Sequence, residues 1–204
     1  MTSALPQMRE LAAFPVPFSM GEICISDHWV VHHREDSMDA PHLEVFTNPE
    51  AACEIAKYDS EGNYRALKTA PNLKRGWLLK LGSAEELKLA LDFFYPAMWG
   101  TWLTWQHHVP VPLRETLSRQ TGMYRVTQKV SDEQAREVIV KTCNSEQGCL
   151  RKILWQIAPD VPHAVLPPDK FSPHPTPGNV PLLCMESCNF LVAAIRQKVK
   201  ASET

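Results

Sequence analysis

The sequence lacks several features that would assign a function directly. Its 204 residues carry 21 Lys and Arg against 23 Asp and Glu, a net charge of −2. A chain so close to neutral has no general attraction for nucleic acid or an anionic membrane, so we expect neither as a partner. Its 8 glycines form no phosphate-binding loop. A nucleophile elbow and a His-Glu-x-x-His motif are also missing, and no complete catalytic set is visible.

Long hydrophobic runs are missing as well. The first ten residues hold no basic stretch followed by an apolar core, so we expect no signal peptide. Residues 93–113 are uncharged, but prolines, a glycine and histidines interrupt them before about 20 apolar residues accumulate. We therefore expect a cytoplasmic protein, in a compartment where thiols stay reduced.

The sequence does contain a mixture of strand and helix patterns, which predicts the α+β class. Residues 1–20 hold three prolines and are expected to form a loose N-terminal arm. Residues 21–109 are predicted to form a small mixed module, in which β-branched and aromatic runs indicate strands and capping residues mark helix starts. The strands are predicted at residues 22–34, 42–47 and 76–81, and the helices at residues 48–58 and 83–94.

Residues 110–204 are predicted to form a mainly helical domain. A capping box of Ser131 and Gln134 begins a helix that extends to about residue 142. Further helical stretches are predicted at residues 150–157 and 185–200. Residues 159–181 contain 8 of the 17 prolines and fit neither a regular helix nor a central strand.

Four of the six cysteines lie in this second domain as two close pairs. They are Cys143 and Cys149, with five residues between them, and Cys184 and Cys188, with three. The first pair follows a predicted helix. The second pair is expected at the N-terminus of the last helix, where its sulfur atoms would face the same point. Clustered thiols in a chain without secretory features indicate a metal or iron–sulfur site rather than disulfides.

The cysteine spacing leaves more than one kind of site open. Zinc is bound tetrahedrally, usually by Cys-x2–4-Cys pairs, which fits the second pair but not the first. A [4Fe–4S] cube accepts irregular spacing because its corners lie several ångströms apart, and we expect this cofactor. Four reduced core cysteines are the third interpretation. Gly148 would permit a close backbone approach, and Arg151 would balance thiolate charge.

Other residues are weaker candidates. Cys24 and Cys53 lie in a predicted strand and a predicted helix, and we interpret both as buried thiols. His28 and His32 are expected to share one face of the first strand, with His33 on the other. We interpret them as a partly exposed polar face rather than a metal or tetrapyrrole site.

Several segments resemble a known family. Gln-Thr-Gly-Met-Tyr-Arg (120–125), Gly-Cys-Leu-Arg-Lys (148–152) and Cys-Met-Glu-Ser-Cys-Asn (184–189) are similar to the [4Fe–4S] domain attached to some long-form sirohydrochlorin cobaltochelatases. Asn-Tyr-Arg-Ala-Leu (63–67) and Asn-Leu-Lys-Arg-Gly-Trp (72–77) are similar to the stabilising domain that precedes it. The resemblance implies that Cys143, Cys149, Cys184 and Cys188 ligate a [4Fe–4S] cluster.

The resemblance also implies a link to tetrapyrrole or cobalamin metabolism. A chelatase needs a further α/β region with metal-delivering histidines, for which we expect 204 residues to leave no room. We predict an iron–sulfur protein that acts as an electron carrier, redox sensor or accessory protein toward a redox partner or a tetrapyrrole enzyme. A zinc-stabilised interaction module and a cluster-dependent enzyme acting on a tetrapyrrole remain as alternatives.

Overall fold

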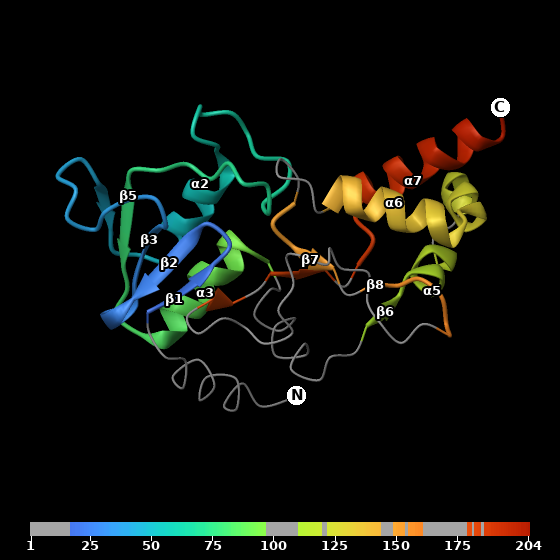
Figure 1. The fold of residues 1–204 in the computed structure, drawn as a ribbon. Coiled ribbons are helices and arrows are strands. Elements are labelled where there is room, and N and C mark those ends of the chain that lie inside the picture. The colour runs from blue at the N-terminus through green and yellow to red at the C-terminus, as the bar shows by residue number, and fades with distance from the viewer. Residues whose placement is uncertain are drawn as a thin grey trace. The chain divides into compact units, whose positions relative to one another are not determined.

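The structure is a computed structural model. The chain folds into two compact units. One unit comprises Met1–Gly100 and His174–Pro181, and the other comprises Thr101–Pro173 and Leu182–Thr204. Both helices and strands occur, which confirms the α+β class (Figure 1). The residues described are 17–96, 110–119, 122–143, 149–153, 155–160, 179–180, 182–184 and 186–204.

The first unit contains a six-stranded mixed sheet with the order β4-β5-β3-β2-β1-β9. The strands β1, β2, β3 and β5 pair antiparallel, whereas β4 and β9 add parallel strands at the two edges. Buried and half-buried residues alternate along β2 and β3, as expected for strands with one face against a core. The bounds are β1 (Phe18–Met20), β2 (Ile23–Ser26), β3 (Val30–His33), β4 (Glu44–Phe46), β5 (Trp77–Lys80) and β9 (Asn179–Val180).

Two helices of this unit, α2 (Ala51–Lys57) and α3 (Ala84–Phe94), pack against each other. The ring of Trp77 on β5 stacks on Phe94 with 5.1 Å between the ring centroids. At the start of α3, the Oγ atom of Ser83 accepts a hydrogen bond from the Glu86 N–H. The Glu86 carboxylate accepts one from the Gly82 N–H, so Ser83 and Glu86 cap the start of the helix predicted at residues 83–94.

The prediction of one continuous strand at residues 22–34 is wrong. These residues form a hairpin of two antiparallel strands, β2 and β3. A turn at Asp27–Trp29 separates β2 from β3, and His28 and Trp29 there have φ values of 61° and 60°. The turn removes the shared face expected for His28 and His32, and His33 is only 1% exposed. Residues other than glycine rarely adopt positive φ, so residues 27–29 contain no ordinary turn signal that would predict this reversal.

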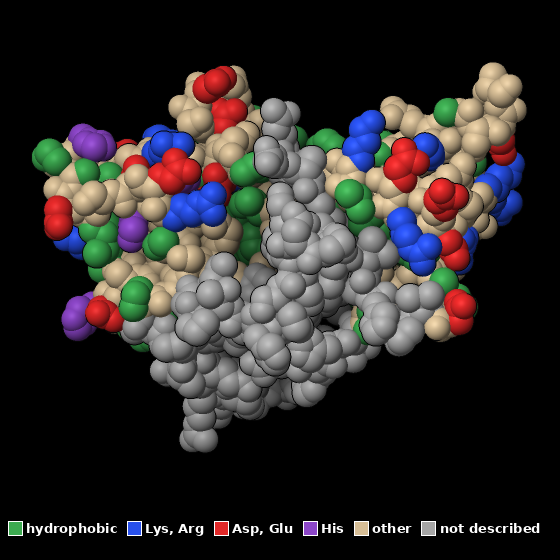
Figure 2. All heavy atoms as spheres, viewed as in Figure 1, with side chains coloured by type: hydrophobic (Ala, Val, Ile, Leu, Met, Phe, Trp, Pro, Cys, Tyr) green, Lys and Arg blue, Asp and Glu red, His purple; other side chains and the backbone are tan. Residues whose placement is uncertain are grey.

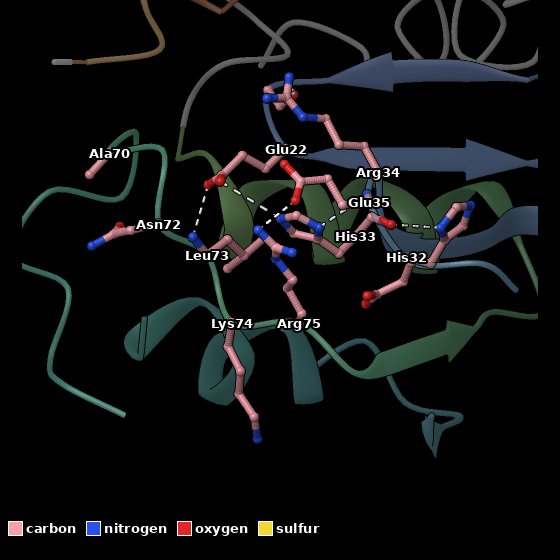
Figure 3. A network of polar contacts seen from close by, with 12 residues as sticks. Glu22, His32, His33, Arg34, Glu35, Ala70, Asn72, Leu73, Lys74 and Arg75 are labelled. Carbon is pink, nitrogen blue, oxygen red and sulfur yellow. Dashed lines mark hydrogen bonds and ion pairs between the residues drawn. The ribbon is translucent and has the colours of Figure 1, made fainter. Parts of the chain in front are cut away.

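A network of buried polar groups surrounds Glu22, in the turn between β1 and β2 (Figure 3). Its Oε2 atom accepts a hydrogen bond from the Leu73 N–H at 2.9 Å and lies 3.6 Å from the Arg65 guanidinium. Its Oε1 atom lies 3.7 Å from Nε2 of His33. The backbone N–H of Glu22 donates to the Tyr95 hydroxyl at 2.9 Å. A buried carboxylate requires partners of this kind, since desolvation otherwise costs several kcal/mol.

The side chain of Arg65, which is 3% exposed, organises the segment between α2 and β5. Its guanidinium donates to the carbonyl groups of Ala56, Lys68 and Ala70, and its Nε donates to Oδ1 of Asn72 at 3.0 Å. One cation therefore satisfies a backbone acceptor near the end of α2 and two more in the loop that follows it. The two sequence motifs similar to the stabilising domain contain Arg65 and Asn72.

The second unit consists of helices around one apolar core, with two short parallel strand pairs. The helices are α5 (Leu113–Ser118), the 3-10 helix η2 (Gly122–Lys129), α6 (Asp132–Cys143) and α7 (Asn189–Ser202). The strand pairs are β6 (Val111–Pro112) with β8 (Trp155–Gln156), and β7 (Lys152–Ile153) with β10 (Leu183–Cys184). Trp155 and Ile139 are completely buried in the core.

The prediction for this unit is confirmed at α6 and wrong at two other places. The Ser131 Oγ atom accepts from the Gln134 N–H, and the Gln134 side chain accepts from the Ser131 N–H, which completes the capping box. The helix predicted at residues 150–157 is instead the two strands β7 and β8, since a short apolar run favours either structure. The last helix begins at Asn189 rather than at residue 185.

Side chains of both charge signs are interspersed over the described part of the face seen in Figure 2. Among the described residues, no helix is long and apolar enough to cross a membrane. The tryptophans of the uncharged segment at residues 93–113 lie outside the described residues, as do the first 16 residues of the predicted arm. The last residues of that arm, Phe18–Met20, form β1.

Candidate metal centre

Helix packing brings Cys143 and Cys188 together. The carboxylate of Glu137 on α6 pairs with Lys198 on α7 at 2.6 Å. Lys129, just before α6, pairs at 2.8 Å with Glu203, just after α7. The start of α6 therefore lies beside the end of α7, and the two helices run antiparallel. Cys143 ends α6 and Cys188 is the N-cap of α7, so this arrangement places both at the same end of the helix pair.

Strand pairing places Cys184 beside the segment that follows Cys149. In the parallel pair of β7 and β10, Cys184 lies opposite Ile153. Cys149 precedes the first residue of β7 by three positions. The Arg151 N–H donates to the Sγ atom of Cys149 at 3.4 Å, and the Cys184 Sγ atom lies 3.2 Å from the Glu186 carbonyl oxygen.

The four cysteines are reduced, and Cys143 interacts electrostatically with the other three. Cys143 and Cys184 are buried, and Cys149 and Cys188 are half-buried. Burial raises the pKa of the Cys143 thiol to about 12, and the negative charges of Cys184, Cys188 and Cys149 contribute to the same increase. Thiols that influence one another in this way form one electrostatic group, although 34 residues separate the two sequence pairs.

The environment of Cys184 contains opposing influences. Burial raises the pKa of its thiol, whereas a backbone hydrogen bond with Glu186 and the positive charge of Arg151 lower it. Arg151 is half-buried, and its Nη1 atom lies 3.6 Å from Oε1 of Glu186. Burial therefore favours the protonated form of the Cys184 thiol, whereas the nearby cation Arg151 favours its thiolate form.

The four cysteines fit a [4Fe–4S] cube in the chemistry of their donor atoms. Iron–sulfur clusters of this type are held by four thiolates, and iron displaces the thiol protons that burial retains here. Among the described residues, no group of three or more Cys, His, Asp or Glu side chains is placed to hold a single metal ion. The corners of a cube lie several ångströms apart, so its ligands need not converge as closely as those around one zinc ion.

The other predicted site residues have different outcomes. Arg151 lies beside Cys184, as a charge-balancing role requires, whereas Gly148 lies outside the described residues. The expectation that both Cys184 and Cys188 begin a helix is wrong for Cys184, which lies in β10. The positive end of α7 therefore acts on Cys188. Glu186 was not identified from the sequence as part of the site. Its position between the predicted ligands Cys184 and Cys188 is the one feature that could have indicated it.

Two family models match this chain, one in each half. Residues 106–197 match the family model of a 4Fe-4S iron-sulfur cluster binding domain. Residues 15–106 match the DR2241 stabilising domain. These matches confirm the resemblance to the accessory domains of long-form chelatases. They also confirm the [4Fe–4S] cofactor, whereas the assignment of the four cysteines as its ligands stays a prediction.

A solved structure shows the same two domains in a larger protein. DR2241 from Deinococcus radiodurans is described as a multi-domain protein with structural similarity to chelatases and with two additional novel domains. It is 27% identical to this chain, with a TM-score of 0.72 over 97% of the chain. The chain spans 41% of the length of DR2241. The comparison with curated proteins found no match.

Proposed function

We propose that Cys143, Cys149, Cys184 and Cys188 ligate one [4Fe–4S] cluster, and that this protein is an accessory electron-transfer module for a chelatase of tetrapyrrole metabolism. The observation that carries the proposal is that α6 and α7 place Cys143 and Cys188 at one end of the helix pair, within the residues that match the cluster-binding domain. The electrostatic interaction of Cys143 with the other three cysteines supports the same grouping. Cys143 ends α6 and Cys188 precedes α7, whereas Cys149 precedes β7 and Cys184 lies in β10.

The ligand set favours electron transfer over catalysis at iron. A bound [4Fe–4S] cluster supplies one-electron chemistry, and four thiolate ligands leave no iron position open for a substrate. Cys143 and Cys184 are buried among apolar residues of the core, an environment that limits the access of water. Arg151 and the N-terminus of α7 supply positive charge beside the thiolates.

The link to a chelatase rests on the similarity to DR2241. That protein is described as similar to chelatases and as carrying additional domains, and this chain corresponds to 41% of its length. We propose that the chain supports a chelatase-like region with electrons or with added stability. The chelatase would be the partner of this module, with sirohydrochlorin as the class of substrate.

The cofactor and its redox role can be tested on the anaerobically purified protein. We expect a brown protein with broad absorbance at about 400 nm that bleaches with dithionite and gains an EPR signal when reduced. A colourless protein with about one zinc ion per chain would overturn the cofactor assignment in favour of a zinc module. An iron-loaded protein that neither bleaches nor gains an EPR signal would overturn the electron-transfer role.

The accessory role needs a separate assay. We expect the cluster-loaded chain to increase the rate of cobalt insertion by a sirohydrochlorin chelatase, or its stability, when the two are mixed anaerobically. The cluster-free Cys184→Ser variant serves as the control and should have no effect on either quantity. Equal rates and equal stability with both proteins would contradict the accessory role.

A further inference from the structure

A partly buried arginine, Arg151, interacts with two of the four cysteines and leaves one of its donors unpaired among the described residues. The side chain of Arg151 is 17% exposed, and its Nε atom is buried without a hydrogen-bond partner among the described residues. Its backbone N–H donates to Cys149, and its guanidinium interacts with Cys184. Arg151 therefore contacts one cysteine of each sequence pair. A buried cation with an unpaired donor requires a compensating anion.

Within the described residues, the acidic partner of Arg151 is Glu186, which lies mostly in solvent. The side chain of Glu186 is 76% exposed, and its Oε1 atom lies 3.6 Å from Nη1 of Arg151. That separation exceeds an ordinary charge-assisted hydrogen bond, so the pair is loose. Glu186 also presents its backbone carbonyl oxygen 3.2 Å from the Sγ atom of Cys184. The Glu186 carboxylate therefore lies beside the cation that interacts with the Cys184 sulfur atom.

We infer that Arg151 and Glu186 set the reduction potential of the bound cluster from opposite directions. This inference rests on the proposed function and deepens it. Arg151 is a positioning residue, whose charge acts through the Cys184 and Cys149 sulfur atoms rather than on a substrate. A cluster with four thiolates becomes more negative when it gains an electron, so a nearby cation favours reduction and a nearby anion opposes it.

The two charges act with unequal strength. Arg151 is mostly buried, where an interaction between charges is screened less than in water. Glu186 projects into solvent, where salt and water weaken its field. We therefore expect the cation to dominate and the site to favour the reduced cluster. Removal of the anion should favour reduction further.

The test is protein-film voltammetry of anaerobically loaded variants, with EPR to confirm an intact cluster. At a fixed applied potential, Arg151→Gln should lower the ratio of reduced to oxidised cluster about tenfold, which is about 59 mV for a one-electron couple. Glu186→Gln should raise the ratio about threefold. Arg151→Lys, which keeps the charge, should stay within about threefold of the unsubstituted protein.

Matched controls come from the ion pair of Lys129 and Glu203. Lys129→Gln and Glu203→Gln make the same charge changes at the far end of α7. The 14 residues of α7 span about 21 Å, well beyond the screening length of about 8 Å at physiological salt. Both control variants should change the ratio by less than about twofold.

The possible results separate the two proposals. A chain that binds no iron and sulfide before any substitution overturns the proposed function. A loaded chain in which Arg151→Gln and Glu186→Gln shift the ratio no more than their controls overturns this inference alone. If the Arg151→Gln variant does not assemble the cluster, the Glu186→Gln variant tests the inference instead, because Glu186 is exposed. A rise relative to Glu203→Gln supports the inference, and no rise overturns it.

Discussion

At the residue scale, the burial of Cys143 dominates the chemistry of the proposed site. Burial, together with the charges of the three neighbouring cysteines when they are ionised, raises the pKa of its thiol from 9.0 to about 12. Without iron, this side chain therefore remains a neutral thiol in the folded protein at neutral pH. Binding of iron must displace its proton, so metal affinity and folding stability both depend on pH.

The raised pKa predicts how the cluster-free protein responds to alkaline pH. Above about pH 9 the unfolded chain loses the Cys143 proton while the folded chain keeps it, so the free energy of unfolding falls as pH rises toward 12. The contribution is at most about 1.4 kcal/mol per pH unit. Urea unfolding between pH 8 and 11 should show a shallower decline for Cys143→Ser. Identical slopes for the two proteins would contradict the assigned burial of this thiol.

The candidate ligands could be predicted residue by residue, but their charged neighbours could not. Four clustered free cysteines restrict the chemistry to a few metal sites whatever the fold. Glu186 gave no such signal, because an exposed acidic residue fits any soluble surface. Only the position of β10 beside β7 places Glu186 and Arg151 together.

At the element scale, capping chemistry was predictable and short apolar segments were not. Ser131 and Gln134 form the reciprocal hydrogen bonds that their spacing predicts, because both partners lie within one helical turn. Residues 150–157 depend instead on contacts from distant parts of the chain. Pairing with β6 and β10 makes them strands, and no local pattern encodes those partners. Tertiary contacts therefore decided the local structure beside Cys149.

The segment between α2 and β5 offers a stability prediction at the same scale. Arg65→Met removes the cation from the buried Glu22 carboxylate and from the carbonyl groups of the segment. We expect the free energy of unfolding to fall by about 3–5 kcal/mol in urea. The control is Arg75→Met, which removes an exposed ion pair with Glu35 and should cost less than about 1 kcal/mol. Equal losses would contradict the role assigned to Arg65.

At the scale of the whole molecule, each of the two units has a buried core of its own. The first unit is held by its sheet and the Glu22 network, and the second by the core that includes Cys143 and Cys184. The motifs in the sequence indicated both domains, but the return of residues 179–180 to the first sheet was not predictable. A two-residue strand within a proline-rich segment has too little pattern to be recognised.

Removal of iron should affect the two units differently. A ligand that binds only the folded state stabilises it by mass action, so loss of the cluster weakens the unit that binds it. We expect anaerobic chelation of iron to increase hydrogen exchange in α6 and α7 at least tenfold. Exchange in β2 and β3 should change less than about twofold. A uniform increase in both units, or none in either, would contradict this assignment.

The most direct test of the central claim is iron and sulfide quantitation on four single variants. Cys→Ser at position 143, 149, 184 or 188 should each reduce the content well below the unsubstituted value of about four iron and four sulfide ions per chain. The controls Cys24→Ser and Cys53→Ser, in the first unit, should keep the full content. Full iron and sulfide in any one of the four variants would show that the cluster is not held by this set of ligands.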